Sequence, residues 1–169
     1  MKFQATVVAA IAAFAYGRQV PAGAGDAAIT AIKEAAVTNG CYEEGANTLE
    51  CLEAILIDGT NAKFTEFKPL LKISPAASYV ATIETLLASV TADVEACYGE
   101  EDCAATAACN AGYNTEGLAA DFQADFVEPI AACCGTDDVQ TCTESAIDAG
   151  IVAASGNVAE AAADAGARK

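Results

Sequence analysis

Eight cysteines divide this 169-residue chain into short segments that disulfides can close. Three of these segments have the same form, with one cysteine before and one after an acidic loop: CYEEGANTLEC, CYGEEDC and CGTDDVQTC. An even number of cysteines in such an arrangement predicts a disulfide framework, which is typical of an oxidising compartment. We therefore predict three disulfides that each close one acidic loop, and one longer bridge: Cys41–Cys51, Cys97–Cys103, Cys134–Cys142 and Cys109–Cys133.

Metal and redox chemistry are the alternatives for these cysteines. Structural zinc sites and thiol redox sites use cysteines separated by two residues, and no pair in this chain has that spacing. The segment DGTNAKFTE, residues 58–66, resembles an EF-hand calcium loop, but its glycine is at the second position and its ligand spacing does not fit. The adjacent Cys133 and Cys134 face different directions on a helix, which suits two different disulfide partners. We expect structural disulfides and no metal site.

The composition predicts an all-α fold. Alanine, the residue with the highest helix propensity, makes up about a quarter of the chain, and apolar residues make up 54% of it. Apolar residues recur at helical spacing in several segments. We predict a disulfide-stapled antiparallel bundle of five to six helices, at about residues 26–38, 48–57, 75–97, 102–110, 118–133 (kinked or restarted at Pro129) and 139–154.

Capping residues and helix breakers set the expected ends of the first two helices. Asp26 is the expected N-cap of the first helix, which ends at the Asn-Gly pair of residues 39–40. Asn47 is the expected N-cap of the second helix, which ends at the Asp-Gly pair of residues 58–59. Residues 60–73 are then expected to be the least regular part of the chain.

The N-terminus predicts export. The segment MKFQATVVAAIAAFAYG has a basic start, an apolar stretch over residues 5–15 and small residues at its end, which is the layout of a secretory signal peptide. The apolar stretch is shorter than the roughly 20 residues of a transmembrane helix. We predict a signal peptide over residues 1–15, one helical domain over residues 25–155, a frayed Ala/Gly-rich tail over residues 156–169, and secretion to the extracellular space.

The same region offers a second localisation. The segment AAFAYGRQVP resembles the Ala-Phe junction of the bipartite plastid-targeting leaders found in algae with complex red plastids. That resemblance implies a leader that extends to about residue 24 and a protein of the thylakoid lumen.

Charge and composition also exclude several classes of function. The chain has 24 acidic and 8 basic residues, and its formal net charge of −16 disfavours binding to nucleic acid or to anionic membranes. It has no histidine, so Ser-His-Asp and Cys-His catalytic groups are excluded. The carboxylates at residues 43–44, 100–102 and 137–138 lie in expected loops, where solvated charge is the ordinary state. We expect a protein that is not an enzyme and has no cofactor.

Two sets of residues are candidates for binding. The segment KFTEFKPLLKI is locally basic and apolar, and a docking patch on it would comprise Lys63, Phe64, Phe67, Lys68, Leu71 and Lys72. A cavity between helices would be lined by Ile83, Leu86, Leu87, Val90, Phe122, Phe126 and Ile130. The ordinary alternative for both sets is core packing, with the lysine stems lying over apolar neighbours.

Three functions fit these features. The first hypothesis is an exported structural or accessory protein that acts through its surface, with another protein as its partner. The second is a carrier of an apolar ligand such as a lipid, sterol or pigment; in this respect the chain is similar in style to lipid-transfer proteins and elicitins, but its cysteine spacing matches neither family, so no family is assigned. The third, which the leader resemblance implies, is a luminal subunit of an algal photosynthetic complex.

Overall fold

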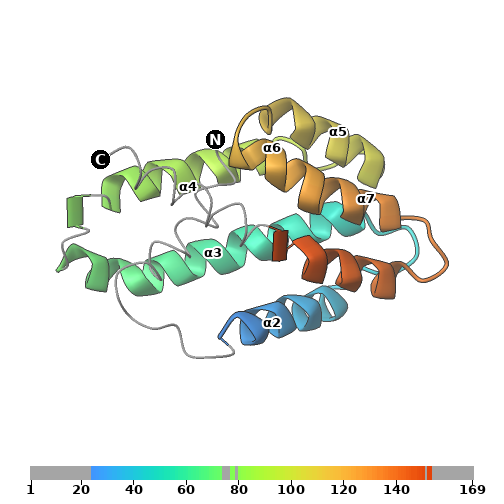
Figure 1. Ribbon diagram of the computed structural model, residues 1–169, viewed down its shortest axis with the longest axis horizontal. Coiled ribbons are helices and arrows are strands. Elements are labelled where there is room, and N and C mark those ends of the chain that lie inside the picture. Colours follow the sequence, from blue (N-terminus) through green and yellow to red (C-terminus); the bar gives the residue numbers. More distant parts are fainter. Residues whose placement is uncertain (1–23, 74–76, 79, 151, 154–169) are drawn as a thin grey trace.

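The computed structural model describes residues 24–73, 77–78, 80–150 and 152–153, and the regular structure within these ranges is entirely helical (Figure 1). This confirms the predicted all-α, disulfide-containing bundle. The predicted signal peptide, its cleavage site and the predicted tail over residues 156–169 lie outside the described residues.

Helix α2 spans Ala24–Thr38 and ends where the sequence predicts. Gly40 has a positive φ of 71° and donates its N–H to the Val37 carbonyl, while Cys41 donates to the Ala36 carbonyl. This pair of bonds is a Schellman motif, in which glycine adopts the left-handed conformation at low cost. The expected N-cap is wrong, because α2 begins at Ala24 and Asp26 lies in its first turn.

Helix α3 spans Thr48–Lys72 and is much longer than predicted. Asn47 caps it as expected, since its Oδ1 accepts the Glu50 N–H at 3.2 Å. The predicted end at residues 58–59 and the predicted irregular segment 60–73 are both wrong. The extra turns contact the following helix through a hydrogen bond of 3.2 Å from Asn61 Nδ2 to Thr91 Oγ1. Tertiary contacts of this kind override a local stop signal worth only about 1 kcal/mol.

Helix α4 spans Val80–Glu95, and residues 77–78 form a short turn before it. The predicted start at Pro75 lies outside the described residues. Helix α5 spans Cys103–Tyr113, close to the predicted range. Its N-cap is Asp102, whose Oδ1 accepts the Ala105 N–H at 2.8 Å.

The helix predicted over residues 118–133 forms three consecutive pieces. They are α6 (Leu118–Phe122), a π-helical turn η2 (Gln123–Val127) and α7 (Glu128–Cys133). Pro129 has no N–H and therefore cannot make the usual helical bond to the residue four positions earlier. One residue before it, Glu128 donates its N–H five residues back, to Gln123. The predicted irregularity at this proline thus takes the form of a wider π turn.

A last helix, residues 139–150 with 152–153, starts after the loop 134–138 as predicted. Its first turn is capped by Asp138, whose Oδ1 accepts the Thr141 N–H at 3.2 Å. An ion pair of 2.8 Å between Lys33 and Asp148 connects this helix to α2.

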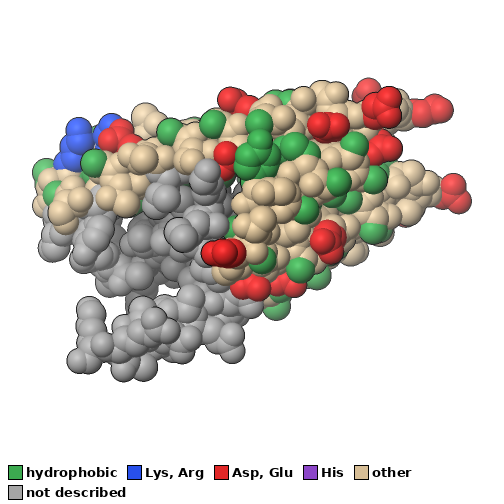
Figure 2. Space-filling view, turned by 90° about the horizontal axis from the view of Figure 1, so that it is seen from above, with side chains coloured by type: hydrophobic (Ala, Val, Ile, Leu, Met, Phe, Trp, Pro, Cys, Tyr) green, Lys and Arg blue, Asp and Glu red, His purple; other side chains and the backbone are tan. Residues whose placement is uncertain are grey.

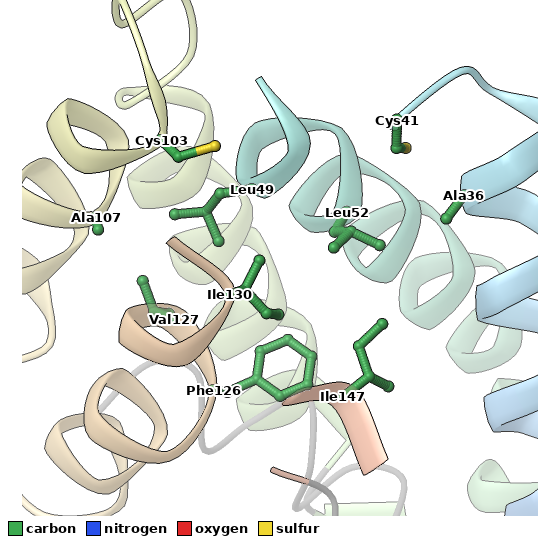
Figure 3. Close-up of a cluster of buried hydrophobic side chains, with 10 residues drawn as sticks. All are labelled: Ala36, Cys41, Leu49, Leu52, Cys103, Ala107, Phe126, Val127, Ile130 and Ile147. Carbon is green, nitrogen blue, oxygen red and sulfur yellow. The ribbon is translucent and has the colours of Figure 1, made fainter. Parts of the chain in front are cut away.

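The helices pack around α3, which contacts α2, α4, α5 and α7 (Figure 1). The main hydrophobic core lies where the N-terminal half of α3 meets α2, α5, η2, α7 and the last helix (Figure 3). Its buried members are Ala36, Cys41, Leu49, Leu52, Cys103, Ala107, Phe126, Val127, Ile130 and Ile147. A smaller cluster of Ile57, Val90 and Val94 joins α3 to α4.

All eight cysteines are paired, and one of the four predicted pairs is confirmed. The disulfides are Cys41–Cys51, Cys97–Cys109, Cys103–Cys134 and Cys133–Cys142. The predicted pairs Cys97–Cys103, Cys134–Cys142 and Cys109–Cys133 are wrong.

The observed pairing follows from the side of the helix on which each cysteine lies. Cys103, at the first position of α5, is buried in the main core with α7, and it bonds to Cys134 just beyond the end of α7. Cys109 is nearly two turns further along α5 on another face, and it bonds back to Cys97. As expected, Cys133 and Cys134 have different partners. However, Cys133 and not Cys134 bonds to Cys142, and Cys134 forms the longer bridge, to Cys103.

Candidate functional site

One face of α5 carries a row of polar side chains instead of apolar ones. Thr106, Asn110 and the C-cap residue Asn114 are spaced four residues apart, which places them along one side of the helix and its C-terminal end. Thr106 and Asn110 are buried, with 0% and 3% of their surface exposed. Because buried polar groups need hydrogen-bond partners, this row is expected to be matched on the neighbouring helices.

The start of α3 supplies the first set of partners. Asn47 Nδ2 donates to Thr106 Oγ1 at 2.7 Å, and the Thr106 hydroxyl donates to the Asp102 carbonyl at 3.1 Å. Asn110 Nδ2 donates to Oε1 of Glu53 on α3. Two side-chain contacts therefore join α5 to α3 in addition to apolar packing.

The π turn supplies the second set of partners. Asn114 Nδ2 donates to Gln123 Oε1 at 3.0 Å, and Gln123 Nε2 donates to the Ala107 carbonyl at 3.1 Å. Gln123 is only 6% exposed. We call the whole set the polar seam, and it comprises Asn47, Glu53, Thr106, Asn110, Asn114 and Gln123.

Glu53 is the titratable member of the polar seam and is only 1% exposed. Its Oε2 has no hydrogen-bond partner. Burial raises the pKa of the Glu53 carboxyl to about 8; the nearby negative charge of Glu50 also raises it, and the hydrogen bond from Asn110 lowers it only in part. Glu53 is therefore largely protonated at neutral pH.

Tyr98 and the first turn of α3 lie close to this carboxyl. Burial raises the pKa of Tyr98 to about 12, and the negative charges of Glu53, Glu95, Asp58 and Glu50 add to the effect. Glu50 Oε2 also accepts the Gly99 N–H at 2.9 Å, which attaches the loop 96–102 to α3. Glu50 thus acts on both Glu53 and Tyr98, and a further negative charge beside it is unfavourable.

Glu53 is a site residue that was not predicted, although the sequence contains a signal for it. Glu53 is four residues after Leu49 and three before Leu56, so it lies on the apolar face of α3. A carboxyl on that face is predicted to be buried. Its neutral partner, Asn110, lies 57 residues further along the chain and gives no local signal.

The predicted acidic loops are exposed and lie together. The carboxylates at residues 43–44, 100–102 and 137–138 are all exposed. The loops 39–47, 96–102 and 134–138 meet at one end of the bundle, because the Cys103–Cys134 disulfide, the Asn47–Thr106 bond and the Glu50–Gly99 bond connect them. Figure 2 shows acidic side chains at this end and lysines at the opposite end. We call it the acidic end.

The predicted docking patch lies on one helix, in the last third of α3. Phe64 and Lys68 are half-buried, and Lys68 forms an ion pair with Glu84 on α4. Lys72 is exposed, and the neighbouring Ile73 is 85% exposed. The side chains of Lys63, Phe67 and Leu71 lie outside the described residues. Docking at this patch stays a prediction.

The predicted cavity residues are divided between packed clusters. Phe126 and Ile130 belong to the main core, and Val90 belongs to the smaller cluster. Phe122 packs against both clusters, and its ring stacks on Phe126 with centroids 4.8 Å apart. Ile83 is half-buried and Leu87 is buried, both on α4, and the Leu86 side chain lies outside the described residues. A ligand cavity also stays a prediction.

Within the described residues, no group of three or more Cys, Asp or Glu side chains has a geometry that would hold a metal ion. None of the helices in the described ranges is long and apolar enough to cross a membrane. No protein-family model, curated protein or solved structure matches the chain.

Proposed function

We propose that this protein is an exported, non-enzymatic structural or accessory protein that acts through its surface on a protein partner. The observation that carries the proposal is the division of the molecule into two unlike ends. Disulfides and the main core stabilise one half, and the paired ends of α3 and α4 extend from it (Figure 1). Four disulfides fit an oxidising extracellular or luminal location.

The extended pair of helices, which we call the α3–α4 arm, comprises residues 61–73 and 80–91. The Lys68–Glu84 ion pair and the Asn61–Thr91 hydrogen bond join its two helices. Its end carries Lys72 and Ile73 on the surface. An exposed Ile beside a lysine, on a protein that is otherwise acidic, supports contact with another protein at this position.

The first test is mass spectrometry of protein purified from its own source. The denaturing mass is expected to be that of the chain without its leader and to lack eight hydrogens, as four disulfides require. The native mass is expected to equal the denaturing mass or that of a defined assembly with another protein. A native mass larger by a few hundred daltons would instead indicate a bound small ligand and would favour the carrier hypothesis.

The second test uses the α3–α4 arm. If a native assembly is seen, the double variant Lys72→Glu/Ile73→Asp is expected to lose it while keeping the thermal unfolding midpoint of the unmodified protein. Glu44→Gln, an exposed change at the acidic end, is the matched control and should keep the assembly. Retention of the assembly by the arm variant would contradict a contact at the arm.

A further inference from the structure

We propose that the polar seam is a proton-dependent latch, in which the neutral Glu53 carboxyl holds α5 against α3 and ionisation of that carboxyl loosens the contact. Such a latch does not require any particular partner. It depends on the burial of Glu53, on the hydrogen bond from Asn110 and on the negative charge of Glu50.

The environment of Glu53 does not compensate a negative charge. The side chain is 1% exposed, and its described hydrogen bond is the one from Asn110. Its second oxygen is buried without a partner, and the ion pairs described, Lys33–Asp148 and Lys68–Glu84, do not include it. A buried carboxylate with so little compensation is strongly unfavourable.

The charges that act on Glu53 and on its neighbour Tyr98 are negative. Glu50 on α3 acts directly on Glu53, whereas Glu95 at the end of α4 and Asp58 on α3 act on Tyr98, which lies in the loop after α4. The contribution of α5 is neutral, through Thr106 and Asn110. Deprotonation of Glu53 would therefore place a negative charge in a buried site beside Glu50. Burial is the main cause that raises the pKa of Glu53 to about 8, and the charge of Glu50 adds to it.

The disulfides determine which part of α5 can open when Glu53 ionises. Cys103 and Cys109 attach the first seven residues of α5 covalently to the segment after α7 and to the loop after α4. The last turn, from Asn110 to Tyr113, lies beyond both disulfides, and among its described contacts the bond from Asn110 to Glu53 joins it to α3. Ionisation should thus open this last turn locally and leave the fold intact.

The sign of the pH dependence follows from proton binding. The pKa of Glu53 is raised from 4.5 to about 8, so the closed state binds more protons than the open state between these values. Closure is therefore most favourable below pH 4.5, weakens as the pH rises above that value, and has lost this contribution above about pH 8. The opening equilibrium of the last turn of α5 is expected to increase by up to about tenfold for each pH unit between these values and to level off above them.

Hydrogen exchange of the backbone amides, corrected for the intrinsic pH dependence of exchange, measures this opening. Amides of residues 110–113 are expected to lose protection between about pH 5 and pH 8 and to change little above that range, while amides of residues 31–37 in α2 keep theirs. Glu53→Gln, which keeps an acceptor for Asn110 but does not ionise, should abolish the pH dependence. Glu44→Gln, an exposed loop carboxyl, should behave like the unmodified protein.

Carbon NMR of the Glu53 carboxyl tests the latch without any substitution and remains decisive if Glu53→Gln fails to fold. A titration midpoint near pH 8, where the loss of protection levels off, supports the latch. A midpoint near the ordinary glutamate value, or protection of residues 110–113 that does not change with pH, overturns it. An unchanged pH dependence in folded Glu53→Gln also overturns it.

Discussion

At the scale of single residues, Gly150 shows how the absence of a side chain permits a close helix crossing. Gly150 is buried where the last helix crosses the π turn η2. A Cβ atom at this position would lie 2.6 Å from Cδ2 of Phe126 and 2.9 Å from the backbone oxygen of Asp125. Since the backbone and the packed ring both limit movement, the crossing requires glycine.

We predict that Gly150→Ala lowers the free energy of unfolding by about 1–3 kcal/mol through overpacking. Urea unfolding followed by circular dichroism measures this change. The control is Gly112→Ala in α5, where an added Cβ would meet no atom within 4 Å. That variant should be neutral or more stable by about 0.5–1 kcal/mol, because alanine is the better helix former. Equal effects of the two substitutions would contradict the close crossing.

At the scale of elements, the length of α3 depends on its contacts with α4 more than on its own sequence. Residues 58–59 form an Asp-Gly pair that ordinarily ends a helix, yet α3 continues for thirteen residues beyond Gly59. Gly59 does not have the positive φ that a helix-ending glycine adopts, whereas Gly40 at the end of α2 has a φ of 71°. The two glycines thus have opposite roles in similar sequence contexts.

We predict that Gly59→Ala raises the free energy of unfolding by about 0.5–1 kcal/mol and that Gly40→Ala lowers it by about 1 kcal/mol. The first change favours the helix that exists, and the second strains a left-handed residue. Thermal unfolding of both variants at one pH provides the comparison. A destabilised Gly59→Ala protein would mean that α3 ends at this position in solution.

At the scale of the whole molecule, the disulfides connect elements that are distant in the chain. Cys103–Cys134 joins cysteines 31 positions apart, whereas Cys133–Cys142 joins cysteines 9 positions apart. In the chain-entropy description, a longer closed loop removes more conformational freedom from the unfolded chain. The bridge between α5 and the end of α7 should therefore contribute most to stability.

We predict that replacing Cys103 and Cys134 by alanine costs about 1 kcal/mol more than replacing Cys133 and Cys142. Urea unfolding of the two double variants measures the difference. Peptide mapping without reduction should first recover the four described pairs from the unmodified protein. Recovery of a Cys97–Cys103 peptide would contradict the pairing and with it the orientation of α5.

Local sequence alone determined the helical class, the end of α2 at Gly40, the Asn47 cap and the Cys41–Cys51 pair. Each of these depends on helix propensity or on groups within about ten residues of one another, so short-range patterns suffice to predict them.

The tertiary structure decided the length of α3, the partners of the other six cysteines and the raised pKa of Glu53. These properties depend on which helix faces meet. Asn110 approaches Glu53 only after α5 has packed on α3, and Cys103 approaches Cys134 only after α5 has packed on α7. Helical periodicity assigns a residue to a face of its own helix, but the contact partner of that face is set by packing of the complete chain.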